Sequence, residues 1–146
     1  MDIYKEIENW HPKLIGENWK IINIDEKLDD FNCFSFVIDI YNDWSGASGK
    51  IWHNPNNRFA TLSNYVDFYS TYGYKICDNN IYEDNYEKIA IYVNNNIVTH
   101  ACKQFKNMWR SKLGSGVIIE HKLEWISGID YENYGEVKII MKKYKK

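Results

Sequence analysis

Apolar residues follow two spacings along the chain, helical in the first half and alternating in the second. After Asn32 they recur at intervals of three and four, as on one face of a helix: Phe34, Val37, Ile38 and Tyr41. This predicts a central helix from Asn32 to about Tyr41 or Trp44, and a second helix that Thr61 begins and Gly73 ends. Strands are predicted over residues 21–24, 74–77, 88–93, 97–104, 108–112 and 135–142, with a short helix over 118–127. Helices followed by antiparallel strands predict an α+β fold.

The stretch 88–101 is typical of a β-hairpin. Apolar and β-branched residues fill both arms, and the three asparagines at 94–96 can take the positive φ angles of a tight turn. Strict alternation along the second arm puts His100 on the same face as Val98 and Cys102. If that face packs on the central helix, the imidazole can reach the helix N-terminus.

A polar loop rich in Asn, Asp, Ser and Gly spans residues 42–58. Roughly fifteen residues without periodicity are long for a connection in a compact domain, and such loops often cover a cleft. We expect four aromatic side chains to line this cleft: Trp44, Trp52, Tyr92 and Trp109.

Composition restricts the class of protein. With 146 residues, 45% of them hydrophobic and 26% charged, the chain predicts one soluble globular domain. We expect residues 1–30 to form an N-terminal extension packed on a core of residues 31–146. The net charge of −2 gives no electrostatic case for nucleic acid as a partner. No run approaches the ~20 apolar residues that span a bilayer, so no membrane partner is expected either.

The cysteines are an odd number, Cys33, Cys77 and Cys102, and lack the CxxC spacing of zinc sites. Together with an N-terminus that has no apolar signal segment, they predict reduced thiols and a cytoplasmic protein. No cluster of His, Asp or Glu has metal-ligand spacing, and no glycine-rich phosphate loop is present. We therefore expect neither a metal nor a cofactor.

Cys33 follows Asn32, a residue type that favours the N-cap of a helix. The free N–H groups and the dipole of a helix N-terminus stabilise a thiolate and lower its pKa, so Cys33 is a candidate nucleophile. The alternative is a small buried hydrophobe, because free cysteine is among the most buried residue types. We interpret Cys77 and Cys102 as structural.

His100 is the candidate base for this thiol, and a buried histidine bonded to backbone is the alternative. Strands 97–104 and 108–112 are expected to pair, which allows Ser111 to orient the imidazole. For Ser111 the alternative is a solvated strand residue. His121 can orient His100, act as the base itself, or lie at the surface.

A cysteine that opens a helix before a meandering sheet resembles the papain-like superfamily in its NlpC/P60 form. The hairpin carries the closest local match, with 89–93 as the first strand and 97–101 as the second. The resemblance implies a papain-like α+β fold in which the central helix carries a catalytic Cys33. One position departs from the pattern, because Lys88 stands where that family has its catalytic histidine. His100 falls where the family keeps its third, orienting polar residue.

A second resemblance, to an uncharacterised bacterial domain family of unknown function, covers residues ~30–142. It rests on six short stretches: 32–34, 88–92, 99–101, 109–114, 119–121 and 134–137.

These observations predict a cysteine-dependent hydrolase or transferase that acts on an amide or thioester. Cys33 would attack the carbonyl, His100 would move the proton, and Ser111 or His121 would orient the imidazole. The backbone N–H of Cys33 and of a neighbour would stabilise the oxyanion. The alternative is a catalytically inactive papain-like module that binds a protein partner, for example a toxin, immunity or phage component. Lys88 favours this alternative, since a lysine with an ordinary pKa of about 10.4 is no neutral base at pH 7.

Overall fold

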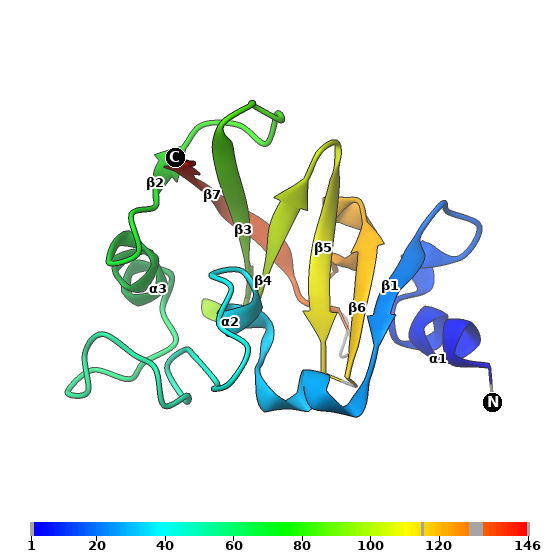
Figure 1. The fold of residues 1–146 in the computed structure, drawn as a ribbon, viewed down its shortest axis with the longest axis horizontal. Coiled ribbons are helices and arrows are strands. Elements are labelled where there is room, and N and C mark those ends of the chain that lie inside the picture. The colour runs from blue at the N-terminus through cyan, green and yellow to red at the C-terminus, as the bar shows by residue number, and fades with distance from the viewer. Residues whose placement is uncertain (1, 115, 129–132, 146) are drawn as a thin grey trace.

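Seven antiparallel strands form one sheet in the order β1-β6-β5-β4-β3-β7-β2 (Figure 1). This computed structural model describes residues 2–114, 116–128 and 133–145. The strands are β1 (Lys20–Ile24), β2 (Lys75–Cys77), β3 (Tyr86–Asn94), β4 (Ile97–Phe105), β5 (Met108–Leu113), β6 (Val117–His121) and β7 (Glu136–Tyr144). The α-helices are α1 (Ile3–Trp10), α2 (Cys33–Phe36) and α3 (Leu62–Ser70), and the 3-10 helices are η1 (Pro12–Leu14), η2 (Glu26–Asp30) and η3 (Leu123–Ile126). The predicted α+β class is confirmed.

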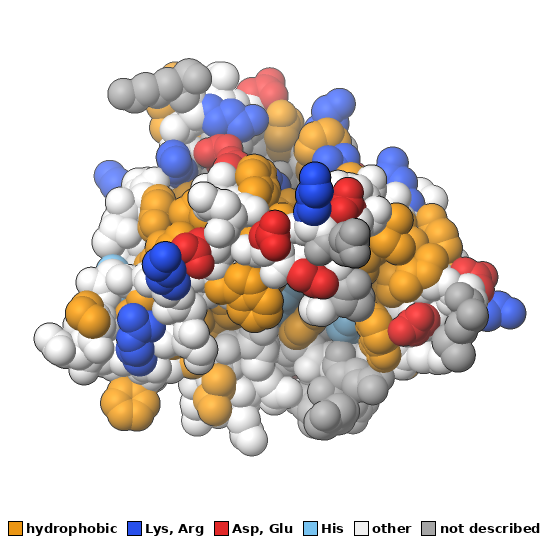
Figure 2. All heavy atoms as spheres, turned by 60° about the horizontal axis from the view of Figure 1, so that its bottom comes forward, with side chains coloured by type: hydrophobic (Ala, Val, Ile, Leu, Met, Phe, Trp, Pro, Cys, Tyr) orange, Lys and Arg blue, Asp and Glu red, His pale blue; other side chains and the backbone are white. Residues whose placement is uncertain are grey.

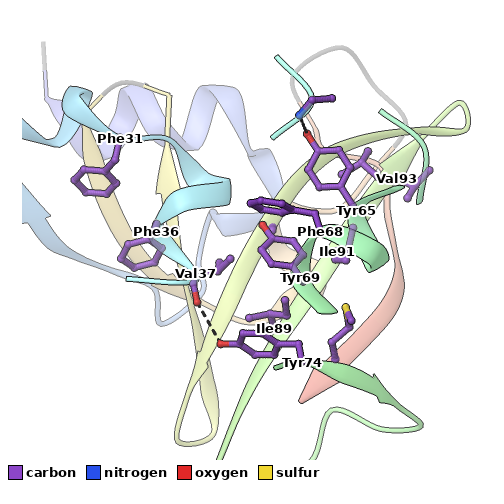
Figure 3. Close-up of a cluster of buried hydrophobic side chains, with 14 of the residues drawn as sticks. Phe31, Phe36, Val37, Tyr65, Phe68, Tyr69, Tyr74, Ile89, Ile91 and Val93 are labelled. Carbon is purple, nitrogen blue, oxygen red and sulfur yellow. Dashed lines mark hydrogen bonds between the residues drawn. The ribbon is translucent and has the colours of Figure 1, made fainter. Parts of the chain in front are cut away.

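One face of the sheet is covered by α2, α3 and the segments beside them. Side chains from these helices, such as Phe36 and Phe68, pack with Ile89 and Ile91 of β3 in the first core cluster (Figure 3). The hydroxyl of Tyr74 donates a hydrogen bond to the carbonyl of Val37 (3.4 Å), which ties the end of α2 to this cluster. The alternating apolar residues of β3 and β4 therefore fix the position of the helix that begins at Cys33.

The opposite face is covered by α1, η1 and η3. Ile7 and Leu14 from the N-terminal segment pack with Trp125 of η3 and with Ala90 and Tyr92 of β3 in the second core cluster. β1 completes the integration of this segment, because it pairs with β6 at one edge of the sheet. Within the described residues, every helix is too short or too polar to cross a membrane.

The central helix is much shorter than its apolar pattern predicted. α2 ends at Phe36, whereas the prediction extended it to residue 41 or 44. Asp39 takes a left-handed φ of 59°, and the N–H of Ile40 donates to the carbonyl of Ser35 (3.1 Å), as in a helix C-terminal cap. The β-branched residues 37, 38 and 40 also lower the helix propensity of this stretch.

Segment 118–127 was also predicted incorrectly in its first half. β6 occupies residues up to His121, and only η3 is helical. The run Val117–Ile119 consists of β-branched residues, and it pairs with β1 on one side and β5 on the other. Thr61 caps α3 as predicted, with its hydroxyl accepting from the N–H of Asn64 (3.2 Å).

Candidate functional site

Strands β4 and β5 pair over only part of their length. Their register runs from Lys103 opposite Arg110 to Phe105 opposite Met108 and does not extend to residues 97–102. β5 continues to pair with β6 as far as Leu113. The two strands therefore diverge, and α2 packs against both of them, in front of the lower part of β4 in Figure 1.

Cys33 lies at this divergence as the first residue of α2. The predicted N-cap is confirmed, since Oδ1 of Asn32 accepts hydrogen bonds from the N–H groups of Ser35 (3.0 Å) and Ser45 (3.2 Å). Nδ2 of Asn32 also donates to the carbonyl of Ser45 (2.6 Å). The N–H of Ala101, in β4, faces the sulfur of Cys33, so the thiol lies beside a strand position that β5 leaves without a ladder partner.

A β-bulge in β4 sets the direction of His100. Tyr92 is opposite His100 but Val93 is opposite Val98, so Thr99 is the extra residue. His100 and Val98 consequently lie on opposite faces of the sheet, and the prediction that they share a face is wrong. The strict alternation behind that prediction cannot hold across a bulge. His100 projects toward the side covered by α1 and η3, away from the side that α2 covers.

On that side, a serine links two buried histidines. Nε2 of His100 lies 2.9 Å from Oγ of Ser111, and the same oxygen lies 2.6 Å from Nε2 of His121. Nδ1 of His121 lies 2.8 Å from the carbonyl oxygen of Lys122. All three side chains are at most 1% exposed, so neither the surface position considered for His121 nor the solvated one considered for Ser111 holds.

The Lys122 carbonyl, at one end of this series of hydrogen bonds, determines which nitrogen of each imidazole carries the proton. A carbonyl oxygen only accepts, so Nδ1 of His121 carries the proton and its Nε2 must accept from the Ser111 hydroxyl. The serine oxygen then accepts from Nε2–H of His100. Burial lowers the pKa of His100 well below its usual range and that of His121 to about 4, so both rings are neutral at pH 7. Nδ1 of His100 therefore carries no proton, and its lone pair has no hydrogen-bond partner among the described residues.

Although they start from opposite faces, Cys33 and His100 line one pocket. The cavity has a volume of about 230 Å³ and lies where β4 and β5 diverge. Its described lining residues are Asn32, Cys33, Phe34, Trp44, Thr99, His100, Lys112, Leu113, Gly114 and Tyr134. Figure 2 turns the lower side of Figure 1 forward and shows hydrophobic side chains exposed among acidic and basic ones on that face.

The thiol itself is protonated in the resting protein. Burial raises the pKa of Cys33 to about 11, against the smaller, opposite effects of the Ala101 N–H, the Lys112 charge and the first N–H groups of α2. The expectation that a helix N-terminus leaves this thiol with a lowered pKa is therefore wrong, because desolvation is the larger effect. Among the described residues, no hydrogen bond joins the sulfur to His100, whose one side-chain partner is Ser111.

Tyr134 holds the imidazole of His100 from one side. The two rings stack with centroids 3.9 Å apart and an interplanar angle of 8°. The carbonyl of Tyr134 in turn accepts a hydrogen bond from the hydroxyl of Thr99, the bulged residue. These contacts and the Ser111 bond restrict the ring to one orientation at the pocket wall.

Of the four aromatic residues expected to line the cleft, Trp44 alone is among the described lining residues, and it is 51% exposed. Trp52 packs on Tyr65 and Phe68 of α3 in the first core cluster. Tyr92 and Trp109 are buried in the second core cluster. The long loop therefore contributes one tryptophan to the pocket and uses the other as core.

Lys88 lies away from this pocket and has a structural role. It is fully buried, and its Nζ lies 2.6 Å from Oε2 of Glu83. It also donates hydrogen bonds to Oδ1 of Asn79 (3.0 Å) and to the carbonyl of Ile81 (2.6 Å). Lys88 thus anchors the loop that precedes β3.

Two residues of the pocket, Lys112 and Tyr134, were not assigned by sequence reasoning. Lys112 is one of two charged residues in β5, the other being Arg110, so its charge was visible in the sequence but its burial was not. Tyr134 gave no such signal, because its stacking on His100 depends on contacts between segments far apart in the chain.

A family model covers most of this chain, from residue 22 to residue 142, and it includes every residue of the pocket. The chain belongs to DUF7689, a domain of unknown function. No curated protein and no solved structure matches it. The expected membership of a family of unknown function is thereby confirmed at that level. Part of this DUF7689 chain lies outside the matched range. Among the described residues, the elements there that contribute to the second core cluster are α1, η1 and the start of β1.

Proposed function

We propose that this DUF7689 protein is a cysteine-dependent hydrolase or transferase acting on an amide or thioester, with a divergent papain-like fold of the NlpC/P60 type. The observation that carries the proposal is that Cys33 and His100, whose Nδ1 carries no proton, line one small pocket. A nucleophile, a neutral base and a group that orients the base are the parts that acyl transfer to a thiol requires.

The pKa shifts specify the form that the chemistry takes. The thiol and the imidazole are both neutral at pH 7, so the thiol loses its proton only as it attacks the carbonyl. The sulfur–carbon bond forms while Nδ1 of His100 takes the thiol proton. His100 then returns that proton to the leaving nitrogen or sulfur as its bond to the acyl carbon breaks. A second acceptor, water or another nucleophile, releases the acyl group with His100 again as the base.

Ser111 and His121 hold His100 in the required tautomer. The hydrogen bond from Nε2–H to the serine keeps the one N–H proton of the neutral ring on Nε2, which leaves Nδ1 to accept the thiol proton. When His100 becomes an imidazolium, Nε2–H still has its acceptor. Ser111 thus takes the orienting role, and His121 fixes the serine hydroxyl.

The raised pKa of Cys33 favours a second candidate function, a non-catalytic module that binds a protein partner. A protonated thiol without a hydrogen bond to imidazole is a weak resting nucleophile. In such a module the half-exposed Trp44 would be a contact residue for the partner. The two candidates differ in one measurable property, acylation of Cys33.

The test uses S-phenyl thioacetate, a small neutral thioester. We expect the wild-type protein to release thiophenol over many turnovers and to carry an acetyl group on Cys33, detected by intact-protein and peptide mass spectrometry. Cys33→Ala should abolish both signals, and His100→Gln should lower kcat/KM by about 100-fold or more, the usual contribution of a general base.

Cys77→Ala is the matched control, because Cys77 is a buried cysteine at the end of β2, outside the pocket. It should acylate and turn over as the wild type does. Thiophenol release that persists in Cys33→Ala would contradict the proposal. A wild-type protein that is neither acetylated nor active would favour the binding module.

A further inference from the structure

Lys112 is a buried lysine on the α2 side of the sheet. It lies opposite Ile118, a member of the first core cluster, whereas its neighbour Ser111 points to the other face. The residue is 3% exposed and lines the pocket together with Cys33. Lysine is almost never fully buried unless it is paired, so its surroundings need an explanation.

The pairing of Lys112 is incomplete. Its Nζ lies 3.7 Å from Oδ1 of Asp29, whose side chain is 64% exposed, and 6.0 Å from the ring centre of Phe31. Lys88, the other buried lysine, shows what a structural role looks like in this chain. Its Nζ is 2.6 Å from a carboxylate and makes further hydrogen bonds to Asn79 and Ile81. Lys112 has no such set of partners among the described residues, although it lines the pocket.

We infer that Lys112 is a catalytic group, whose ammonium stabilises the negative charge that forms on the Cys33 sulfur and then on the carbonyl oxygen of the acyl group. This inference rests on the proposed function. Lys112 is the one cationic side chain among the described residues that line the pocket.

Charge balance explains why such a group is needed. A neutral thiol and a neutral imidazole generate an imidazolium and an anion when the thiol attacks a carbonyl. In a pocket lined by Phe34, Leu113 and Tyr134 the anion is poorly solvated, and a fixed cation there acts more strongly than in water. The charge of Lys112 already opposes the effect of burial on the pKa of Cys33. Burial lowers the pKa of Lys112, and the groups that face it, Asp29 from η2 and Cys33 from α2, oppose this effect and favour its charged form.

The experiment measures alkylation of Cys33 by iodoacetamide at about pH 8, quantified by peptide mass spectrometry. Removing the cation in Lys112→Met should lower the second-order rate constant at least about 5-fold, and Lys112→Arg should keep most of the rate. The turnover of S-phenyl thioacetate by Lys112→Met should fall mainly in kcat, because the interaction is stronger in the transition state than with bound substrate.

Asp29→Asn separates this role from a structural one. It removes the counter-charge of Lys112 but keeps the cation, so we expect an alkylation rate equal to or above that of the wild type. If Lys112 only anchors η2, Asp29→Asn and Lys112→Met should slow alkylation alike, which would overturn the inference. Asp29→Asn changes an exposed residue and so remains informative even if Lys112→Met does not fold.

Two further outcomes are decisive. An unchanged iodoacetamide rate in Lys112→Met, with a lower rate for the anionic reagent iodoacetate, would make Lys112 a site for a substrate carboxylate and overturn the inference. Because alkylation needs no turnover, failure of the inference about Lys112 is distinguishable from failure of the proposed function. If wild-type Cys33 is acetylated but all variants are alkylated at equal rates, the catalytic role of Lys112 is overturned and the proposed function of the protein stands.

Discussion

The Ser111 hydroxyl determines what His100 can do. Without it, the neutral imidazole of His100 could carry its proton on either nitrogen. The Lys122 carbonyl can only accept a hydrogen bond, and through His121 and Ser111 this sets the direction of every hydrogen bond up to His100. Nδ1 of His100, the ring that lines the pocket, is left unprotonated. A hydroxyl suits this position because it donates and accepts at once, which neither a carboxylate nor an ammonium does.

We therefore expect Ser111→Ala to affect both stability and activity. It leaves two buried imidazole nitrogens without partners, and each such group costs about 1–3 kcal/mol, so the free energy of unfolding should fall by about 2 kcal/mol or more. Turnover of S-phenyl thioacetate should fall at least about 10-fold, because the base loses its orienting group. Urea denaturation and steady-state kinetics measure the two effects.

Ser127→Ala is the control for this variant, since the Ser127 hydroxyl makes an exposed hydrogen bond to the carbonyl of Glu124 (2.8 Å). It should change stability by less than about 0.5 kcal/mol, as is usual for surface substitutions. If Ser111→Ala proved as stable and as active as Ser127→Ala, the chain of hydrogen bonds would have no role in orienting His100.

At the level of secondary structure, the position of Cys33 depends on one short helix. α2 has a single turn, so its own hydrogen bonds contribute little and its cap contributes much. Asn32 binds both the helix and the loop that carries Trp44, through Ser35 and Ser45. The cap thus connects Cys33 to the loop whose Trp44 also lines the pocket.

Asn32→Ala should therefore change the reactivity of Cys33 as well as the stability of the protein. We expect a loss of about 1–2 kcal/mol, the upper range for a cap, and a changed alkylation rate for Cys33. Thr61→Ala removes the cap of α3 and is the matched control, with a loss of about 1 kcal/mol and an unaltered alkylation rate. Equal alkylation rates in both variants would contradict a positioning role for Asn32.

The caps and most strands could be predicted because their signals are local. Asn32 and Thr61 precede apolar helical turns, and the arms of the hairpin show their β-branched residues directly. The direction of His100 could not be predicted, because the bulge at Thr99 depends on pairing with β3 and on the carbonyl of Tyr134. The length of α2 was overestimated for a similar reason. Its apolar residues beyond Phe36 contact the core from an irregular turn.

Considered as one molecule, the protein buries three of its four histidines. His11, His100 and His121 are each at most 3% exposed, and burial lowers the pKa of all three. His11 comes from the segment after α1 and packs against Tyr134, with ring centroids 5.1 Å apart. The N-terminal segment thereby closes the side of the site opposite α2, and its docking keeps these rings out of water.

This enclosure makes stability depend on pH in a defined direction. In the unfolded chain a histidine takes a proton near pH 6.5, whereas folded His121 takes one only near pH 4. Between these values the unfolded state binds more protons, so the free energy of unfolding falls as the pH is lowered. The slope is up to about 1.4 kcal/mol per pH unit for each such histidine. Above about pH 6.5 these groups no longer contribute to the slope.

Urea denaturation between about pH 4.5 and 6.5 tests this linkage. We expect His121→Gln to be less stable than the wild type at pH 7 but to show a shallower slope, by up to about 1.4 kcal/mol per pH unit, because one protonation of the unfolded state has been removed. Ser111→Ala is the control, since it also breaks the Ser111–His121 hydrogen bond but keeps both imidazoles, so its curve should be lowered with its slope retained. If His121→Gln kept the wild-type slope while Ser111→Ala lost it, the acid sensitivity would come from the hydrogen bonds and not from burial of neutral histidines.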